Sequence, residues 1–299
     1  MAITLKQLRY LVQVAESGSI SLAARRLYIS QPALSSAIFQ LETNLGVSLL
    51  IRHHARGISL TPAGSKFLAR ARSLLGYADE LEWLGRELGD SVRGEIVVGC
   101  FLTLAPFFMP KLLHKLQQSH PELYVRLIEG ALDEVQDSLL SGNTEIALLY
   151  NIDLNPQLTV ERMTQEQPYV VLPINHSLAK KQTISISALK NEPMILLDLP
   201  HSREYFQSLF SDAGIEPTIR HRTQSFELVR GLVGKGHGYS ILNLQPRSNQ
   251  TYDGGRVKYI PIETQKKDLA IAIAWPENIP LTRRAEVFIE LCRRFFKST

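Results

Sequence analysis

Apolar positions in the first 20 residues recur every three or four residues, which predicts an amphipathic helix. Thr4 and Gln7 have the spacing of a capping box at its start, and Gly18 is placed to end it. The buried face is expected to comprise Leu5, Leu8, Leu11, Val12 and Ala15. The chain therefore opens with a helix that needs a partner surface.

Residues 21–45 predict two further helices joined by a tight turn. Ser21 is placed to cap the first and Ser30 the second, with Pro32 in its first turn, where the missing N–H costs nothing. The first helix has an apolar face of Leu22, Ala23 and Leu27. The second has a buried stripe of Leu34, Ala37, Ile38, Leu41 and Leu45. Its opposite face is polar apart from one aromatic and fits against base edges in a major groove: Gln31, Ser35, Ser36 and Phe39.

Residues 47–60 predict a two-stranded ribbon that follows a helix stop at Gly46. The tip of the ribbon is basic and turn-forming: Arg52, His53, His54, Ala55, Arg56 and Gly57. A cationic ribbon beside a recognition helix is a wing, placed to touch phosphates or a minor groove. Two adjacent histidines without further ligands do not predict a metal site, and no cofactor is expected.

Thr61 and Pro62 open a long helix that is expected to run to about Leu88. Small and apolar residues spaced three and four apart form a heptad seam along it: Phe67, Ala71, Leu74, Ala78, Leu81, Gly85 and Leu88. This face either joins two copies of the chain or packs on its own domain, and the small head favours a dimer. Residues 89–94 then supply a hinge.

From Gly94 onward, apolar strands alternate with helices, which predicts βαβ units and a parallel sheet. The expected strands are 95–100, 124–130, 145–150, 168–174, 193–198, 218–223, 239–242, 258–262 and 269–275. The expected helices are 103–116, 132–141, 202–213, one that follows Ser225, and 283–297. The second half of the chain is therefore an α/β domain.

The composition, 44% hydrophobic and 21% charged over 299 residues, fits two or three globular domains. No apolar run approaches the ~20 residues of a membrane span, and the opening residues lack the features of a secretory signal. Two cysteines do not make a disulfide framework. We therefore expect a cytoplasmic protein that does not contact a membrane.

The net charge of +4 is unevenly distributed along the chain. Residues 1–72 carry nine basic and two acidic side chains, so that the remainder is slightly acidic. A basic head on an acidic body predicts that the head meets a polyanion, and together with the helix pair and the wing this favours double-stranded DNA.

The first 70 residues resemble the LysR-type transcriptional regulators nearly without gaps. The motif A-A-x-x-L-x-x-S-Q-P-A-L-S occupies 23–35, L-E-x-x-L-G occupies 41–46, and L-T-x-A-G follows the wing at 60–64. Residues 94–299 match the family in layout more than in motif. The resemblance implies an α/β fold class: an N-terminal winged helix-turn-helix with a long linker helix, then an effector domain of two α/β subdomains like the periplasmic solute-binding proteins.

The resemblance also implies a division of the chain. A winged helix-turn-helix is expected over 1–60, a dimerising linker helix and hinge over 61–93, and an effector-binding domain over 94–299. Subdomain I would comprise 94–162 and 266–299, and subdomain II would comprise 163–265. The chain would cross between them near 159–164 and 262–268.

Family members are bacterial regulators that bind interrupted inverted repeats at promoters, commonly as homotetramers built from linker-helix dimers. Many respond to a small effector, and RNA polymerase is a further candidate partner. Mapped by position, the DNA-binding residues would be Ser30, Gln31, Pro32, Ser35, Ser36, Phe39, Arg52, His53 and Arg56. Ser36 and Phe39 depart from the family pattern, which often has basic or polar residues there. Phe39 would either touch a thymine methyl group or pack at the base of the dimer.

The effector is expected between the subdomains, at the carboxyl ends of strands. Strand order and the resemblance together select Cys100, Phe101, Thr103, Tyr150, His201, Ser202, Thr223 and Ser225. Thr103 and Ser202 are equally well placed to cap a helix, which would be a purely structural role. Arg203 would pair with a carboxylate effector, or would simply be solvated.

Three alternatives have less support from the sequence. An enzyme would need a catalytic motif, but GLVGKGHG (231–238) is not a P-loop, and His201 beside Ser202 is no nucleophile–base pair. A redox-sensing regulator would use Cys100 and Cys292, which are favoured as buried structural thiols. A transported-solute receptor would not need a basic head.

Overall fold

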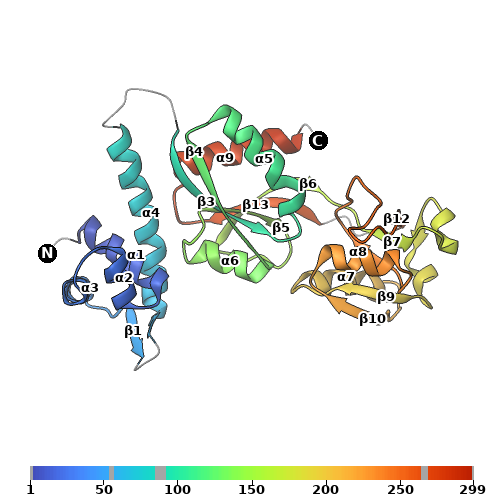
Figure 1. Cartoon of the computed structure of the whole chain (residues 1–299), viewed down its shortest axis with the longest axis horizontal. Helices are drawn as coiled ribbons and strands as arrows, with labels where there is room; N and C mark the ends of the chain where they lie inside the picture. The colour runs from blue at the N-terminus through green and yellow to red at the C-terminus, as the bar shows by residue number, and fades with distance from the viewer. Residues whose placement is uncertain (1–2, 54–56, 85–91, 264–268, 298–299) are drawn as a thin grey trace.

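The computed structural model describes residues 3–53, 57–84, 92–263 and 269–297. Figure 1 shows a helical head (residues 3–60), the long helix α4 beside it, and two α/β subdomains next to each other. The expected architecture of a winged helix-turn-helix, a linker helix and a two-subdomain α/β effector domain is confirmed.

The head packs α1 (Leu5–Ser17), α2 (Ile20–Arg26) and α3 (Gln31–Leu45) around one core. Its fully buried members include Leu11, Val14, Ala23, Leu34, Ile38, Leu41 and Leu49. The capping box of Thr4 and Gln7 is present, and Ser30 caps α3 through its hydroxyl oxygen. Gly18 and Gly46 end their helices in the left-handed conformation, as the sequence predicts.

Ser21 does not cap α2, so this prediction is wrong. The helix begins two residues earlier than expected, and the Ser19 hydroxyl accepts from the backbone N–H of Leu22. The earlier start turns Leu22 outward and buries Ala24 instead. The Ser21 hydroxyl donates to Oε1 of Gln31 at 2.9 Å, and so joins α2 to the first residue of α3.

The wing is an antiparallel pair of β1 (Leu50–His53) and β2 (Gly57–Leu60). Glu42 of α3 fixes its position, because one carboxylate oxygen accepts from the backbone N–H groups of Leu49 and Leu50 at 2.7 and 3.0 Å. The acidic residue of the L-E-x-x-L-G motif therefore attaches the ribbon to the recognition helix.

Helix α4 (Pro62–Leu84) starts at a cap formed by Thr61, whose hydroxyl accepts from the N–H of Gly64 at 2.8 Å. Gly64 lies so close to the wing that a Cβ there would sit 2.0 Å from the carbonyl oxygen of Leu49. The L-T-x-A-G motif therefore describes a helix cap and a backbone contact that only glycine permits. The predicted helix end near Leu88 lies outside the described residues.

The heptad seam of α4 is only partly open. Ala71 is buried within the chain, so the expectation of packing on its own domain holds for this part of the helix. Leu74 and Leu81 are 50% and 71% exposed, although both are large and apolar. Gly85 and Leu88 of the predicted seam lie beyond the described part of α4.

Subdomain I has a five-stranded sheet in the order β4-β3-β5-β13-β6. Its strands are β3 (Gly94–Phe101), β4 (Leu123–Gly130), β5 (Ile146–Tyr150), β6 (Leu158–Gln165) and β13 (Ala270–Pro276). Figure 1 shows α5 (Ala105–Ser119) and α9 (Arg283–Lys297) on one side of the sheet and α6 (Leu132–Leu140) on the other.

Subdomain II has a four-stranded sheet in the order β11-β7-β12-β8 and a parallel pair of β9 and β10. These strands are β7 (Tyr169–Pro173), β8 (Ile184–Ser185), β9 (Pro193–Leu197), β10 (Thr218–Thr223), β11 (Ser240–Leu242) and β12 (Val257–Glu263). Helices α7 (Ser202–Ser211) and α8 (Phe226–Gly234) pack against them, with two short 3₁₀ turns at Ser177–Lys180 and Ile186–Leu189.

The prediction of a parallel sheet is wrong in part, because both large sheets contain parallel and antiparallel pairs of strands. β13 runs antiparallel to β5 and β6, and β7 runs antiparallel to β11 and β12. The cause is the return path of the chain: β13 enters subdomain I from subdomain II, against the direction of the βαβ strands. Near the crossing, the Glu166 N–H donates to the Leu269 carbonyl at 2.9 Å.

A glycine contact joins α4 to subdomain I, and it yields a prediction. Gly142 has φ +68°, and a Cβ there would lie 2.7 Å from the Cα of Ala69 on α4. We expect Gly142→Ala to cost about 1–2 kcal/mol for the left-handed backbone and about 1–3 kcal/mol more for the clash. Urea unfolding would measure the loss, and hydrogen exchange over 66–76 would report loosening of α4.

Gly214→Ala is the matched control, since Gly214 has φ +65° and nothing lies within 4 Å of its Cβ position. It should lose only the backbone contribution and leave exchange of α4 unchanged. Equal losses in the two variants would contradict a packing role for Gly142.

Candidate DNA interface and effector cleft

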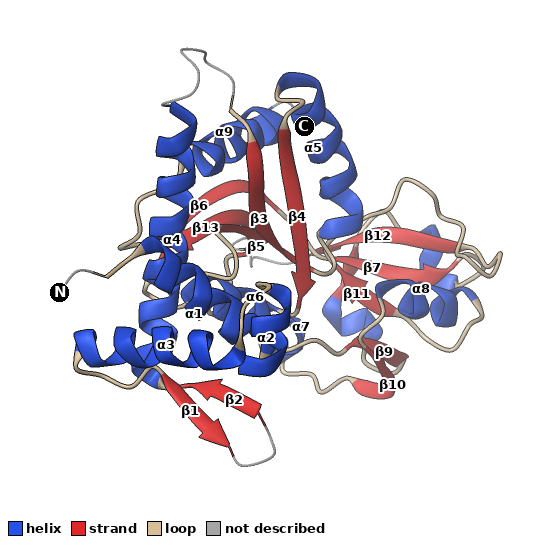
Figure 2. Cartoon of the chain, turned by 60° about the vertical axis from the view of Figure 1, so that its left-hand side comes forward, coloured by secondary structure: helices blue, strands red, loops and turns tan. Residues whose placement is uncertain are grey.

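The polar face of α3 lies on the surface of the head, next to the wing. Figure 2 shows α3 and the β1–β2 ribbon together at the lower edge of the head. Gln31, Pro32 and Ser36 are exposed, and the ring of Phe39 is 65% exposed, whereas Ser35 is half-buried. The predicted α3 residues therefore share one accessible surface, with Ser35 at its edge.

Two of the predicted α3 residues make hydrogen bonds within the head. The Ser30 hydroxyl accepts from the N–H of Ala33 at 3.3 Å and is therefore engaged in capping. Oε1 of Gln31 accepts from Ser21, which leaves the amide NH₂ of Gln31 as the group able to donate to a base. Guanine O6 and N7 and thymine O4 are acceptors for such a donor in the major groove.

The wing contributes cations next to this face. Arg52 is exposed on β1, and Nε2 of the exposed His53 lies 2.7 Å from the Ser59 hydroxyl across the ribbon. Arg56 lies outside the described residues. Within the described part of the ribbon, Arg52 is thus the predicted residue with a permanent charge for phosphate.

Tyr28 is a surface residue that the sequence reasoning missed. It stands between α2 and α3, has φ +54° and is 96% exposed, although turns in this conformation usually take glycine or asparagine. Arg25 and Arg26, in the last turn of α2, are also exposed. A large aromatic in a turn beside two arginines was the signal available in the sequence.

The predicted effector site is a closed cleft between the subdomains. A cavity of about 20 Å³ remains there, lined by four predicted residues: Phe101, Thr103, Tyr150 and Ser202. The other four predicted residues are not part of its lining. Cys100 is buried, Ser225 caps α8, the Thr223 hydroxyl accepts from the N–H of Ser225, and His201 lies before α7.

Thr103 and Ser202 are not the helix caps that the sequence allowed them to be. α5 begins at Ala105 after Leu104, and α7 begins at Ser202 itself, with no side-chain cap at either start. Both residues are nevertheless buried, and Thr103 hydrogen-bonds the phenol of Tyr150. Their hydroxyls are therefore directed to the interior of the cleft.

The cleft has an aromatic interior. The rings of Phe101 and Tyr150 meet edge to face with centroids 5.6 Å apart, and Phe206 and Phe226 line the opposite side. Burial raises the pKa of the Tyr150 phenol well above its usual value. Tyr150 is therefore neutral at any physiological pH and acts as a hydrogen-bonding group.

Asp153 and His201 meet across the opening of the cleft. Nδ1 of His201, in subdomain II, lies 3.1 Å from a carboxylate oxygen of Asp153, in subdomain I. Both residues have positive φ, +45° for Asp153 and +64° for His201, which is strained for non-glycine residues. Both residues of this contact thus adopt unfavourable backbone conformations, which the sequence alone does not indicate.

Arg203 is not available to a carboxylate effector in this conformation. Its Nε donates to Oδ1 of Asp198, and Arg222 lies 3.6 Å from the other oxygen of the same carboxylate. An anionic effector would have to displace Asp198 from both guanidinium groups.

The sequence reasoning also missed Asn243 and the aromatic pair Phe206 and Phe226. Asn243 follows β11 directly, so the rule that ligands lie at the carboxyl ends of strands could have selected it. Phe206 and Phe226 carry no local signal, because their helices reach the cleft only through tertiary packing.

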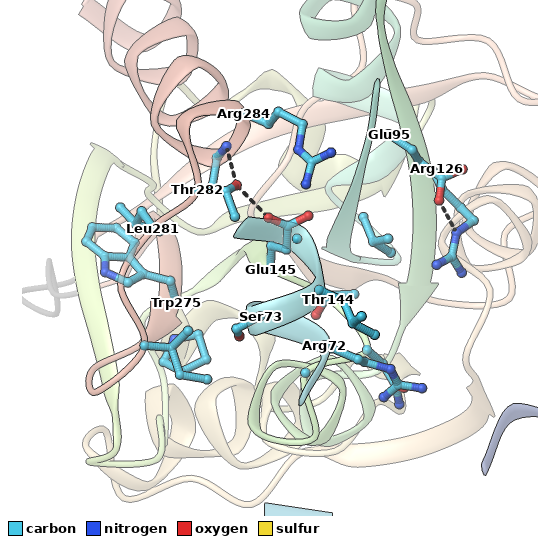
Figure 3. Close-up of a pocket in the computed structure, with 18 of the residues that line it drawn as sticks. Arg72, Ser73, Glu95, Arg126, Thr144, Glu145, Trp275, Leu281, Thr282 and Arg284 are labelled. Carbon is cyan, nitrogen blue, oxygen red and sulfur yellow. Dashed lines mark hydrogen bonds and ion pairs between the residues drawn. The ribbon is translucent and has the colours of Figure 1, made fainter. Parts of the chain in front are cut away.

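A much larger cavity, of about 1500 Å³, lies between α4 and subdomain I. Figure 3 shows Arg72 and Ser73 of α4 on one wall and Glu145, Thr282 and Arg284 on another. The charges around it are mostly paired, as in Arg72 with Glu16 and Arg126 with Glu95. The cavity separates α4 from subdomain I except at a few direct contacts.

Those contacts link the linker helix to the loop between β13 and α9 and to the end of α6. The Arg70 guanidinium donates to the carbonyl of Asn278, and the Tyr77 hydroxyl donates to the carbonyl of Pro280 at 2.5 Å. Arg72 donates to the carbonyl of Ser141 at 3.2 Å. Subdomain I and α4 are therefore connected directly by hydrogen bonds.

Both cysteines lie in the core of subdomain I, Cys100 on β3 and Cys292 on α9, with no exposed surface. Burial, and after it the charge of Glu129, raises the pKa of the Cys100 thiol, and burial likewise raises that of Cys292. Reactive thiols need a lowered pKa and access to solvent. The geometry therefore favours structural thiols over the redox alternative.

The described residues contain no cluster of three or more His, Cys, Asp or Glu side chains that would suit a metal ion. No helix in the described part of the chain has both the length and the apolar character to cross a membrane.

Comparison with known proteins matches both parts of the chain to one family. The bacterial regulatory helix-turn-helix protein family of lysR type matches residues 5–65, and the LysR substrate binding domain matches residues 89–297. The structure of HinK, a LysR family transcriptional regulator from Pseudomonas aeruginosa, is similar with 38% identity and a TM-score of 0.67, covering 99% of each chain.

Two further relatives are similar over nearly their whole length. The transcriptional dual regulator GltC of Bacillus subtilis is 30% identical, covering 98% of this chain and 97% of its own. Full-length CbnR complexed with its target DNA is 26% identical with a TM-score of 0.57, covering 98% of this chain and 100% of its own.

The burial of the thiols predicts their reactivity. We expect neither Cys100 nor Cys292 to react with iodoacetamide in the native protein at pH 7.5, because their raised pKa values and burial deny the reagent a thiolate. Both should be alkylated in urea, which is the control. Mass spectrometry would detect each product. A Cys100–Cys292 disulfide after mild peroxide, with altered DNA binding, would revive the redox alternative.

Proposed function

The chain belongs to the LysR family of DNA-binding transcriptional regulators, and from this premise we propose how it reads DNA and how it is switched. It binds an interrupted inverted repeat at promoters as a dimer of dimers, and a small effector between the two subdomains controls it. One observation carries the proposal: the single helix α4 contacts both the head, which bears the exposed polar face of α3, and subdomain I, which forms one side of the cleft.

The base contacts come from Gln31, Ser35 and Ser36, and Ser30 and Pro32 set the start of the helix that carries them. Phe39 supplies an apolar contact for a thymine methyl group, which its exposure favours over packing within the head. Arg52, His53 and Arg56 contact phosphates from the wing and fix the register of the head on the duplex.

Dimerisation uses the open half of the α4 seam. Leu74 and Leu81 lie seven residues apart, so both project from one face of the helix, and a twofold partner would cover them. Two such dimers would form the homotetramer. RNA polymerase is a further candidate partner of the DNA-bound assembly.

The effector separates the two subdomains, because the closed cleft leaves room for little more than one water molecule. Subdomain I then moves against α4 through the carbonyls of Asn278 and Pro280, which α4 holds directly. The domains that move are those expected from the sequence: 1–60, 61–93 and 94–299.

Replacing Gln31 tests the groove assignment. We expect Gln31→Ala to lose about 1–3 kcal/mol of discrimination at one base pair, because a donor to a base edge is removed. Binding to a library of operator variants would measure this. Gln40→Ala is the matched control, an exposed glutamine on the same helix outside the predicted contact set. An unchanged sequence preference for Gln31→Ala would exclude it from base readout.

Replacing Leu74 tests the dimer. We expect Leu74→Glu to raise the dimer dissociation constant at least tenfold, about 1.4 kcal/mol, because a charge would be buried on each side of the twofold axis. Sedimentation velocity would measure the dissociation. Leu228→Glu makes the same change at a leucine of similar exposure on α8 and should leave the dimer intact. Equal behaviour of the two variants would move the interface away from α4.

A further inference from the structure

The charge of the cleft indicates which chemical class of effector it takes. The residues that line it are aromatic, aliphatic or neutral and polar, and none of the lining residues in the described chain is cationic. Carboxylate ligands are usually held by a guanidinium, an ammonium or several convergent N–H groups. The described lining of this cleft contains neither a guanidinium nor an ammonium group.

The cations nearest to the cleft already have partners. Arg203 and Arg222 share the carboxylate of Asp198, and His201 contacts Asp153 at the opening. Recruiting any of them for an anion would take that cation from its aspartate partner, so the new ion pair would be offset by the loss of an existing one. The charged side chains at the mouth of the cleft are therefore paired with one another without a ligand.

Two buried polar atoms of this region have no hydrogen-bond partner among the described residues. One is Oδ1 of Asn243, which lines the cavity, and the other is the hydroxyl of Tyr205 on α7. Tyr205 lies near enough to Tyr150 to act on its ionisation. The unsatisfied carbonyl oxygen of Asn243 in the cavity, and the hydroxyl of Tyr205 near it, are acceptors for a ligand that donates hydrogen bonds.

Glu166 adds a negative charge beside the same wall. It is half-buried where the chain crosses between the subdomains, and its N–H donates to Leu269. Its carboxylate has no ion pair or hydrogen bond within the described chain, yet it acts on the phenols of both Tyr150 and Tyr169. Tyr169 in turn donates to the carbonyl of Leu244, another lining residue.

We propose that the effector is a small organic cation, an ammonium on a compact aromatic or aliphatic body, that places its charge toward Glu166 and its apolar part among the rings of the cleft. This rests on the proposed function, since it assigns the ligand of the same cleft. The aromatic faces attract a cation, the unsatisfied oxygens accept its N–H groups, and Glu166 neutralises it.

The ionisation of Glu166 makes the proposal sensitive to pH. Partial burial raises the pKa of Glu166 to about 7. An ammonium whose pKa is near that of lysine stays charged across this range, so its affinity should rise as pH increases through 7 and Glu166 becomes anionic. The described titratable groups facing Glu166, Tyr150 and Tyr169, stay neutral because burial raises their pKa values. His201 and Asp153 form an ion-pair contact at the mouth of the cleft, and a Glu166 variant separates any contribution of that contact from the contribution of Glu166.

Matched probes of opposite charge provide the test. Phenethylamine and 3-phenylpropanoate have nearly the same shape, as do benzylamine and phenylacetate. Calorimetry with the full-length protein would measure each at pH 6 and pH 8. We expect at least one amine to bind and its acid counterpart not to, and the amine to bind up to about tenfold more tightly at pH 8.

Two variants assign the effect to this cleft. Glu166→Gln should weaken amine binding about tenfold at pH 8 and abolish its pH dependence, because the charge is lost and the shape is kept. Glu216→Gln, at an exposed glutamate of subdomain II, should change neither. Glu166→Gln should also raise the thermal midpoint at pH 8 more than at pH 5, since the unpaired carboxylate destabilises the fold only when ionised.

Tighter binding of the acids would overturn the proposed charge class. So would an absence of amine binding up to 10 mM, or amine binding that Glu166→Gln leaves unchanged. None of these results would touch the proposed function, because recognition of operator DNA by Gln31 variants is measured without any effector. Loss of operator preference alone would likewise leave the charge class of the cleft standing.

Discussion

The guanidinium of Arg72 joins the three parts of the molecule. It lies on α4, pairs with Glu16 of α1 at 3.5 Å, and donates to the Ser141 carbonyl of subdomain I at 3.2 Å. Burial lowers the pKa of Arg72, because its side chain is largely enclosed by the modules that it connects. Between α4 and subdomain I, the other contacts described above are a glycine against α4 and two hydrogen bonds to the loop before α9, beside a large cavity. Helix α4 is thus anchored to the head, where Leu68 is part of the core and Arg9 pairs with Asp79, and it contacts subdomain I at fewer points.

Charge is arranged differently in the two functional regions. The head gathers cations on its surface and leaves them exposed, as a polyanion partner requires. In the effector domain the cations at the mouth of the cleft are paired with aspartates, while Glu166, deeper at the crossing, is unpaired among the described residues. In the proposed function, a long-range field draws the head to DNA, whereas the cleft discriminates between ligands by short-range complementarity. The two forms of recognition therefore depend very differently on salt.

Much of the fold follows from local patterns. α9 and β10 have the predicted bounds, and Ser30, Gly18 and Gly46 act as the local rules require. Where two local rules competed, sequence could not decide: Ser19 and Ser21 are both acceptable caps, and only the packing of α2 selects Ser19. The rule that ligands lie at the carboxyl ends of strands selected Phe101, Thr103 and Ser202, which line the cleft. It could not supply Phe206 or the contact of Asp153 with His201, because those depend on how two subdomains close.

The contact of Gly64 with the Leu49 carbonyl has a consequence for how such proteins diversify. The cap at Thr61, the glycine beneath the wing and the Glu42 carboxylate attach recognition helix, ribbon and linker helix to one another through backbone groups. None of these bonds involves the side chains of α3 that are proposed to contact bases. Exposed side chains of α3 outside these bonds can therefore vary while the geometry between the head and α4 is kept. Evolution can redirect such a regulator to new operators without rebuilding the machinery that senses the signal.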